Sequence, residues 1–216
     1  EQLGAITICK EGEVLSGWNG SNFTYEKKYL PGATFKVTAG ADIYKADGTK
    51  VYNKDDVIKE AVTTGIDGKV IVTDLHLGTY VVIETGTIDG YTINTTPQTV
   101  DIQYKDQTVD IQYEATSIYN TRQKGQVSVV KKDSDTENPL DGGKYTGENG
   151  VAAYTVDIPI ANGYYITETQ APYAYTRNQR DTYSFNFNYL SNTTPTATFS
   201  HTFKNDRTTA KIHIYK

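Results

Sequence analysis

The sequence lacks the residues on which several common classes of protein depend. Its only cysteine is Cys9, which excludes an internal disulfide framework. The net charge is −5 at pH 7, and lysine and arginine form no basic block. Because phosphate binding needs clustered basic side chains, nucleic acid is not an expected partner. No apolar run is long enough to cross a membrane, so we expect no membrane contact within this fragment.

Residues that could form a catalytic or metal site are also scarce. A reactive cysteine would need a histidine partner, and the three histidines, His76, His201 and His213, belong to no matching motif. We therefore expect Cys9 to be inert, and we expect no enzyme turnover, no metal and no cofactor. The chain begins at Glu1 without methionine or a signal segment, which we interpret as a mature or trimmed fragment.

The residues that are abundant favour β-structure. The chain has 18 tyrosines, 18 glycines and many threonines and valines, a composition typical of half-buried strands joined by turns. Alternating apolar residues predict strands at 4–10, 34–37, 69–72 and 79–83. The hexapeptide TVDIQY occurs at 99–104 and again at 108–113, which predicts two strands, or one strand and its extension.

One short helix is expected within the first half of the chain. Asn53 can cap it, and it would end before Gly65. Its apolar stripe would consist of Val57, Ile58, Ala61 and Val62. A single helix among many strands fits a β-sandwich with a decorated loop.

A long internal repeat divides the chain into two similar domains. Residues 4–10, GAITICK, match 125–131, GQVSVVK, and residues 80–84 match 164–168. Asn120 ends the first repeat and Asn205 the second, and each is followed by a lysine eleven residues later. We predict domains at 1–121 and 122–209, with 210–216 as the start of a following repeat or a terminal strand.

In each predicted domain, strand alternation places one lysine, one glutamate and one asparagine on the apolar face. These residues are Lys10, Glu84 and Asn120 in the first domain, and Lys131, Glu168 and Asn205 in the second. Taken singly, such a lysine could be a snorkelling side chain at a strand end, and such a glutamate could be an edge carboxylate facing water. The recurrence of all three in the same order favours a buried, reactive triplet.

Burial gives this triplet its chemistry. It lowers the pKa of a lysine and raises that of a glutamate, so the amine becomes a neutral nucleophile. A protonated glutamic acid can hydrogen-bond the asparagine carbonyl and shuttle protons. Lysine and asparagine held in contact can then form an amide and release ammonia, once per domain and without turnover. We predict Glu84 and Glu168 as the proton shuttles.

The order of these motifs resembles that of Cna B-type domains from Gram-positive adhesins and pilins. The similarity lies in Gly-x-Val-x-Val-x-Lys at 125–131, in YYITETQAP at 164–172 and in the final-strand asparagine. The resemblance implies two tandem immunoglobulin-like, prealbumin-like β-sandwiches with cross-links Lys10–Asn120 and Lys131–Asn205. The first domain departs from the pattern because it lacks Ala-Pro after Glu84, and the second because its second-strand region is nearly absent.

The resemblance predicts a structural stalk or backbone module of an adhesin or pilus on the bacterial cell wall, outside the cell. Its expected partners are adjacent domains of the same surface protein. An alternative is an adhesive module that binds a host protein or glycan through a long first loop at 11–28, which carries Trp18, Phe23 and Tyr25. These aromatic residues could also pin the loop to the domain, which is the preferred interpretation. An accessory sandwich of a secreted enzyme is a third possibility.

Overall fold

The computed structural model describes residues 1–141, 150–177 and 182–214, and this part of the chain contains strands and no α-helix. The fold divides into two compact units. The first contains Glu1–Asn19, Thr24–Gln123 and Ser191–Pro195, and the second contains Gly20–Phe23, Lys124–Leu190 and Thr196–Lys216. The described residues include no helix that could span a membrane.

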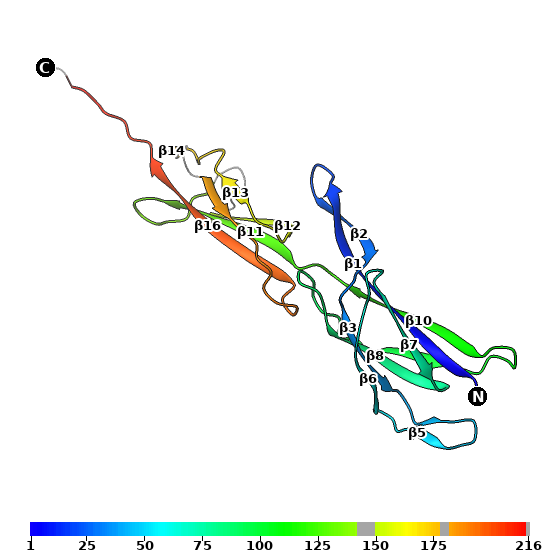
Figure 1. Cartoon of the computed structure of the whole chain (residues 1–216). Coiled ribbons are helices and arrows are strands. Elements are labelled where there is room, and N and C mark those ends of the chain that lie inside the picture. Colours follow the sequence, from blue (N-terminus) through cyan, green and yellow to red (C-terminus); the bar gives the residue numbers. More distant parts are fainter. Residues whose placement is uncertain (142–149, 178–181, 215–216) are drawn as a thin grey trace. The chain divides into compact units, whose positions relative to one another are not determined.

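Two four-stranded sheets form most of the first unit (Figure 1). One contains β10 (Ile111–Asn120), β1 (Leu3–Trp18), β2 (Phe23–Tyr29) and β7 (Lys69–Leu75), and β7 pairs with β1. The other has the order β6 (Val57–Thr63), β3 (Thr34–Ala39), β8 (Gly78–Gly86), β9 (Gln98–Ile102). A small hairpin joins β4 (Ile43–Tyr44) to β5 (Lys50–Tyr52). The first and last strands, β1 and β10, run parallel as neighbours.

The core of the first unit follows the alternation of its strands. Ile6 and Ile8 on β1 are fully buried, as are Tyr80 and Val82 on β8 and Phe35 on β3. Burial of side chains this large is the main favourable term in folding a sandwich of this size. Cys9 has the opposite parity on β1 but is also buried, at 8% exposure.

Two predictions for the first unit are wrong. The predicted helix is absent, and its apolar residues lie in β6, which pairs antiparallel with β3. Ile58 and Val62 of this strand pack against the core, and β-branched residues fit a pleated edge strand well. The expected loop at 11–28 is a β-hairpin instead, because β1 continues to Trp18 and β2 starts at Phe23.

The two copies of TVDIQY lie in different sheets with opposite faces inward. In the first copy, Val100 and Ile102 of β9 are buried. In the second, Ile111 and Tyr113 of β10 are exposed, and the core receives Ile118 further along the strand. The strand to which each copy belongs, and not the hexapeptide itself, therefore determines which face of the copy is buried.

The second unit is built around a sheet with the order β12 (Val151–Pro159), β11 (Lys124–Asp133), β16 (Thr196–Arg207), β14 (Tyr175–Thr176). A second sheet pairs β13 (Tyr164–Thr167) with β15 (Thr182–Phe185). Again the first and last strands, β11 and β16, are parallel neighbours. The core contains several aromatic residues, and the rings of Phe185 and Phe199 stack with centroids 4.0 Å apart.

Some predictions concern residues that the structure does not describe. The second-strand region of the second domain, predicted to be nearly absent, falls mainly on 142–149, outside the described residues. Lys216 lies outside them as well. Of the predicted strand at 210–216, the described residues form no strand, and Ile212 and Ile214 are 86% and 91% exposed.

Candidate functional site

Three strands bring the predicted triplet of the first unit together. Lys10 lies on β1, Glu84 on β8 of the opposite sheet, and Asn120 ends β10. In the parallel pairing of β1 with β10, Lys10 lies opposite Ile118 and Gly12 lies opposite Asn120. Lysine and asparagine therefore occupy adjacent strands two residues apart in register, with both side chains inward. All three residues are at most 1% exposed.

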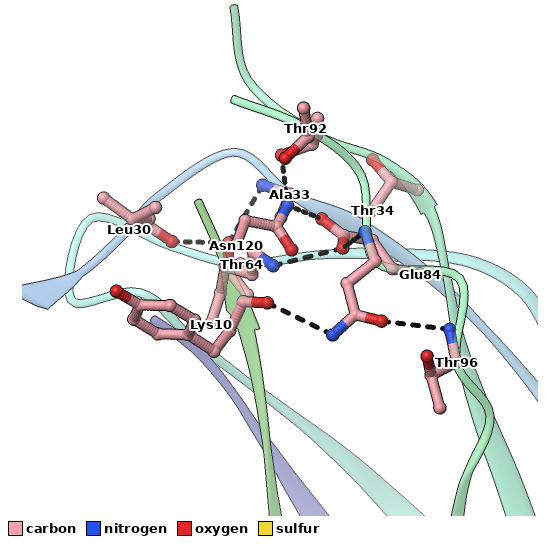
Figure 2. Close-up of polar contacts among 12 residues, drawn as sticks. Lys10, Leu30, Ala33, Thr34, Thr64, Glu84, Thr92, Thr96 and Asn120 are labelled. Atoms are coloured by element: carbon pink, nitrogen blue, oxygen red, sulfur yellow. Dashed lines mark hydrogen bonds and ion pairs between the residues drawn. The ribbon is translucent and has the colours of Figure 1, made fainter. Parts of the chain in front are cut away.

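Glu84 connects the lysine to the asparagine. Lys10 Nζ lies 3.1 Å from Glu84 Oε2, and Asn120 Nδ2 donates a hydrogen bond to Glu84 Oε1 at 2.9 Å. Figure 2 shows the contacts around Glu84 and Asn120 together with those of the adjoining turns. The backbone N–H of Asn94 also donates to Glu84 Oε2, at 2.9 Å. One carboxylate thus contacts both the amine and the amide nitrogen.

The asparagine amide is oriented differently from the prediction. We expected the glutamic acid to donate to the carbonyl oxygen, but Glu84 contacts the amide nitrogen. A second acceptor for this nitrogen is Thr87 Oγ1, at 2.8 Å. The carbonyl oxygen Oδ1 of Asn120 is buried and has no hydrogen-bond partner among the described residues.

Burial changes the protonation equilibrium of the lysine. Removal from water lowers the pKa of Lys10, and the neighbouring Glu84 carboxylate offsets part of that effect. The neutral amine is therefore more accessible at neutral pH than in an exposed lysine. This is the form in which an amine acts as a nucleophile.

The second unit repeats the arrangement in the same register. Lys131 of β11 lies opposite Phe203 of β16, and Asp133 lies opposite Asn205, so lysine and asparagine are again two residues apart. Glu168 directly follows β13 and forms a buried ion pair with Lys131. Asn205 Nδ2 donates to Glu168 Oε1 and Oε2 at 3.1 and 2.9 Å. The oxygen Oδ1 of Asn205 is buried without a hydrogen-bond partner among the described residues.

A buried carboxylate beside the second triplet was not predicted. Asp133 is 1% exposed and accepts hydrogen bonds from Arg207 Nε at 2.7 Å and from the Tyr175 hydroxyl at 2.8 Å. It also accepts the backbone N–H groups of Asp135 and Thr136, both at 2.9 Å. The Arg207 bond contributes most to lowering the pKa of Asp133, followed by the backbone and tyrosine bonds. Strand alternation continued past Lys131 would have placed Asp133 inward.

The predicted ligand-binding aromatics lie along the hairpin of β1 and β2. Trp18 ends β1 and is 50% exposed. Phe23 and Tyr25 lie on β2 and are partly buried. Their role in binding stays a prediction. In the described ranges, no group of three or more histidine, cysteine, aspartate or glutamate side chains could hold a metal ion.

Comparison with known proteins identifies the fold. Residues 24–117 match the SpaA family of prealbumin-like fold domains. These residues lie in the first unit, which is therefore similar to a prealbumin-like domain of that family. This confirms the predicted resemblance and the all-β, prealbumin-like fold. No curated protein matches the chain.

Several solved structures match the chain at low sequence identity. The Bacillus anthracis TIE protein matches 96% of this chain with 21% identity and a TM-score of 0.61, and the chain spans 34% of that protein. The shaft pilin SpaA from Lactobacillus rhamnosus GG matches 99% of this chain and 100% of its own, at 13% identity and a TM-score of 0.37. The major pilin subunit BcpA of Bacillus cereus matches 95% of this chain and 100% of its own, at 14% identity and a TM-score of 0.34.

Proposed function

We propose that the chain is a structural module of a Gram-positive surface pilus or adhesin stalk, in which an amide bond between lysine and asparagine closes each unit. The bonds would join Lys10 to Asn120 and Lys131 to Asn205. The observation that carries this proposal is the repetition of one buried lysine–glutamate–asparagine triplet in the same strand register. The prealbumin-like fold of residues 24–117 supports the assignment to pilin-type modules.

The contacts fit a direct amide exchange. The neutral Nζ of Lys10 attacks Cγ of Asn120, a new C–N bond forms, and the bond from Cγ to Nδ2 breaks. Glu84 accepts a proton from Nζ through Oε2 and returns a proton to Nδ2 through Oε1, so nitrogen leaves as ammonia. The sum is one amine and one primary amide converted to one secondary amide and ammonia, with no oxidant and no cofactor.

The fold supplies both proximity and a driving force. Groups held in contact react as if at very high concentration, which can lower a barrier by about 7–11 kcal/mol. A buried lysine–carboxylate pair also carries a desolvation cost that its mutual attraction only partly offsets. Starting from the Lys10–Glu84 ion pair, amide formation consumes the amine and releases ammonia, and the proton of the former ammonium stays on Glu84, so neither charge remains buried. Each unit can react once, so the glutamates act in self-cross-linking and not in turnover.

The placement of the bonds suits a load-bearing stalk. Lys10 lies near the start of the first unit and Asn120 near its end. Tension that enters through β1 would cross to β10 at the bond, and residues 11–119 would bear little of it. The bond from Lys131 on β11 to Asn205 on β16 would act in the same way. Adjacent modules of the same extracellular surface protein would be the partners on either side.

Intact-mass measurement of the folded protein tests the proposal. We expect a mass lower than that of the sequence by two ammonia molecules. Glu84→Gln and Glu168→Gln should each restore one ammonia, because the carboxylate that moves the proton is gone. The matched control is Glu60→Gln, which removes an exposed glutamate paired with Lys36 and should leave both losses intact. An unmodified mass in well-folded protein would overturn the proposed function.

A further inference from the structure

The amide of Asn120 is held entirely through its nitrogen. Both hydrogens of Nδ2 have acceptors, namely Glu84 Oε1 at 2.9 Å and Thr87 Oγ1 at 2.8 Å. The oxygen of the same amide is buried without a hydrogen-bond partner among the described residues. The terminal torsion of an asparagine has a broad energy profile, so packing alone defines it weakly. The two acceptors on nitrogen therefore set the plane of the amide.

The second unit satisfies the same requirement with a different chemical group. Asn205 Nδ2 donates to Glu168 and also to the backbone carbonyl of Thr176, at 3.1 Å. Thr176 is fixed on β14, which pairs with β16 opposite Asp206. The acceptor is a side-chain hydroxyl in one unit and a main-chain oxygen in the other, and both accept a hydrogen bond from the asparagine Nδ2. Two unlike groups in one geometric role indicate that the role itself matters.

We propose that Thr87 is a positioning residue for the Lys10–Asn120 cross-link, and that the carbonyl of Thr176 has the same role for Lys131–Asn205. The inference rests on the proposed function. Glu84 determines that nitrogen and not oxygen faces the proton shuttle, since a carboxylate repels the amide oxygen. Thr87 then fixes the angle of the amide plane, so that Cγ is presented to the amine and Nδ2 to the proton.

Mutation can remove the Thr87 hydroxyl but not the backbone carbonyl of Thr176. The cross-linking rate of the second unit therefore serves as the internal reference for that of the first. The chain is purified unfolded in urea, checked for an unmodified starting mass, and diluted to start folding. Acid-quenched samples are read by intact mass and by peptide mapping of each cross-link, and folding is followed in parallel by circular dichroism. Because small misplacements of reacting groups are costly, we expect Thr87→Val to slow the Lys10–Asn120 bond roughly 10- to 100-fold.

Two substitutions separate positioning from packing. Thr87→Val keeps the shape and loses the acceptor, whereas Thr87→Ser keeps the acceptor and loses a methyl group. The proposal expects Thr87→Ser to react within about threefold of the parent chain and Thr87→Val to be slow. A slow Ser variant with a fast Val variant would overturn it in favour of packing. If Thr87→Val prevents folding of the first unit, Thr87→Ala replaces it in the same comparison.

The rates of the two cross-links, compared within each variant, separate the positioning role from the cross-linking function. In every variant the Lys131–Asn205 bond should form at the parent rate, because Thr87 belongs to the other unit. An unchanged rate for Lys10–Asn120 in folded Thr87→Val would overturn the positioning role and leave the cross-linking function standing. Absence of ammonia loss at both sites in the parent chain would overturn the proposed function, and the positioning role with it.

Discussion

The two units contain the same triplet in the same register but close that end of the sandwich differently. Two residues after the lysine, the first unit has Gly12, where an added Cβ would lie 2.4 Å from a methyl carbon of Leu30 and 2.9 Å from the backbone oxygen of Asn120. The second unit has Asp133 at that place, bonded to Arg207 and Tyr175. Close apolar packing in one unit and a charged cluster in the other thus accompany the same lysine–asparagine register.

A tyrosine after a left-handed residue completes each arrangement. Tyr91 follows Gly90 and donates to the Glu13 carbonyl at 2.6 Å. Tyr175 follows Ala174 and donates to Asp133 at 2.8 Å. In both units this tyrosine ties a turn to the first strand, within β1 at Glu13 and at the end of β11 at Asp133. The turn needs a positive φ in both units, and only the first unit supplies glycine for it.

The largest expected difference comes from removing one bond at a time. By the loop-entropy argument used for disulfides, each proposed cross-link would stabilise its own unit by about 4–5 kcal/mol, because it would close a loop of roughly 75 to 110 residues. Lys10→Ala should therefore destabilise the first unit by at least that amount and leave the second unchanged, and Lys131→Ala should do the reverse. Hydrogen exchange, which resolves the units separately, measures both effects.

Loss of the lysine also leaves a buried glutamate without its partner, which adds to the destabilisation. The double variant Lys10→Met with Glu84→Gln removes that charge together with the bond. Its remaining deficit reports the cross-link alone. Equal stability of the first unit in this variant and in the parent chain would show that the bond contributes nothing to folding.

Strand alternation was sufficient to predict the triplets, because Ile6, Ile8 and Lys10 share a face whatever the rest of the fold does. It failed for the helix, since Ile58 and Val62 also fit period two, and pairing with β3 decided between the two periods. It could not predict which face of each TVDIQY copy is buried, because the same residues point inward in β9 and outward in β10.

The finer features of the sites depend on contacts that the sequence does not encode locally. The turn of the Asn120 amide toward Glu84 and Thr87 joins the end of β10 to the end of β8, two segments far apart in the sequence. Thr87 lies just past the end of β8, where strand parity no longer predicts direction. Asp133 is the exception, because it lies on β11 in the same parity as Lys131 and could have been predicted.

The cluster of Asp133, Arg207 and Tyr175 should make the stability of the second unit depend on pH in the acid range, through the titration of Asp133. The pKa of Asp133 lies below its ordinary value in the folded chain, because Arg207, Tyr175 and two backbone N–H groups stabilise the carboxylate. A depressed folded pKa contributes stability that is fully present above the unfolded pKa of about 3.9 and is lost as the pH falls toward the folded pKa. Asp133→Asn should remove that contribution.

Acid titration with unit-resolved hydrogen exchange measures this effect. The parent second unit should be more stable than Asp133→Asn at pH 6, and the difference should shrink steadily below about pH 4. Asp106→Asn is the control, since Asp106 is an exposed carboxylate of the first unit bonded to Thr108. It should leave the second unit unaffected. A difference that is constant from pH 6 to pH 2 would contradict the titration of Asp133.

The smallest expected effect comes from the two left-handed turn residues, and it has opposite sign in the two units. Gly90 has φ of 90°, and a Cβ there would meet no atom within 4 Å, so Gly90→Ala introduces backbone strain and no clash. Left-handed backbone costs an L-residue about 1–2 kcal/mol, so this change should destabilise the first unit by about 1 kcal/mol.

Ala174 already has φ of 68° and its side chain is exposed, so Ala174→Gly relieves strain without leaving a cavity. Glycine's greater freedom in the unfolded chain offsets part of that gain, which leaves at most about 1 kcal/mol in favour of the second unit. Chemical denaturation of the cross-linked proteins measures both, and neither change should alter the intact mass relative to its sequence. Destabilisation by Ala174→Gly would show that the entropy of glycine exceeds the strain, and the two turns would then not be equivalent in energy.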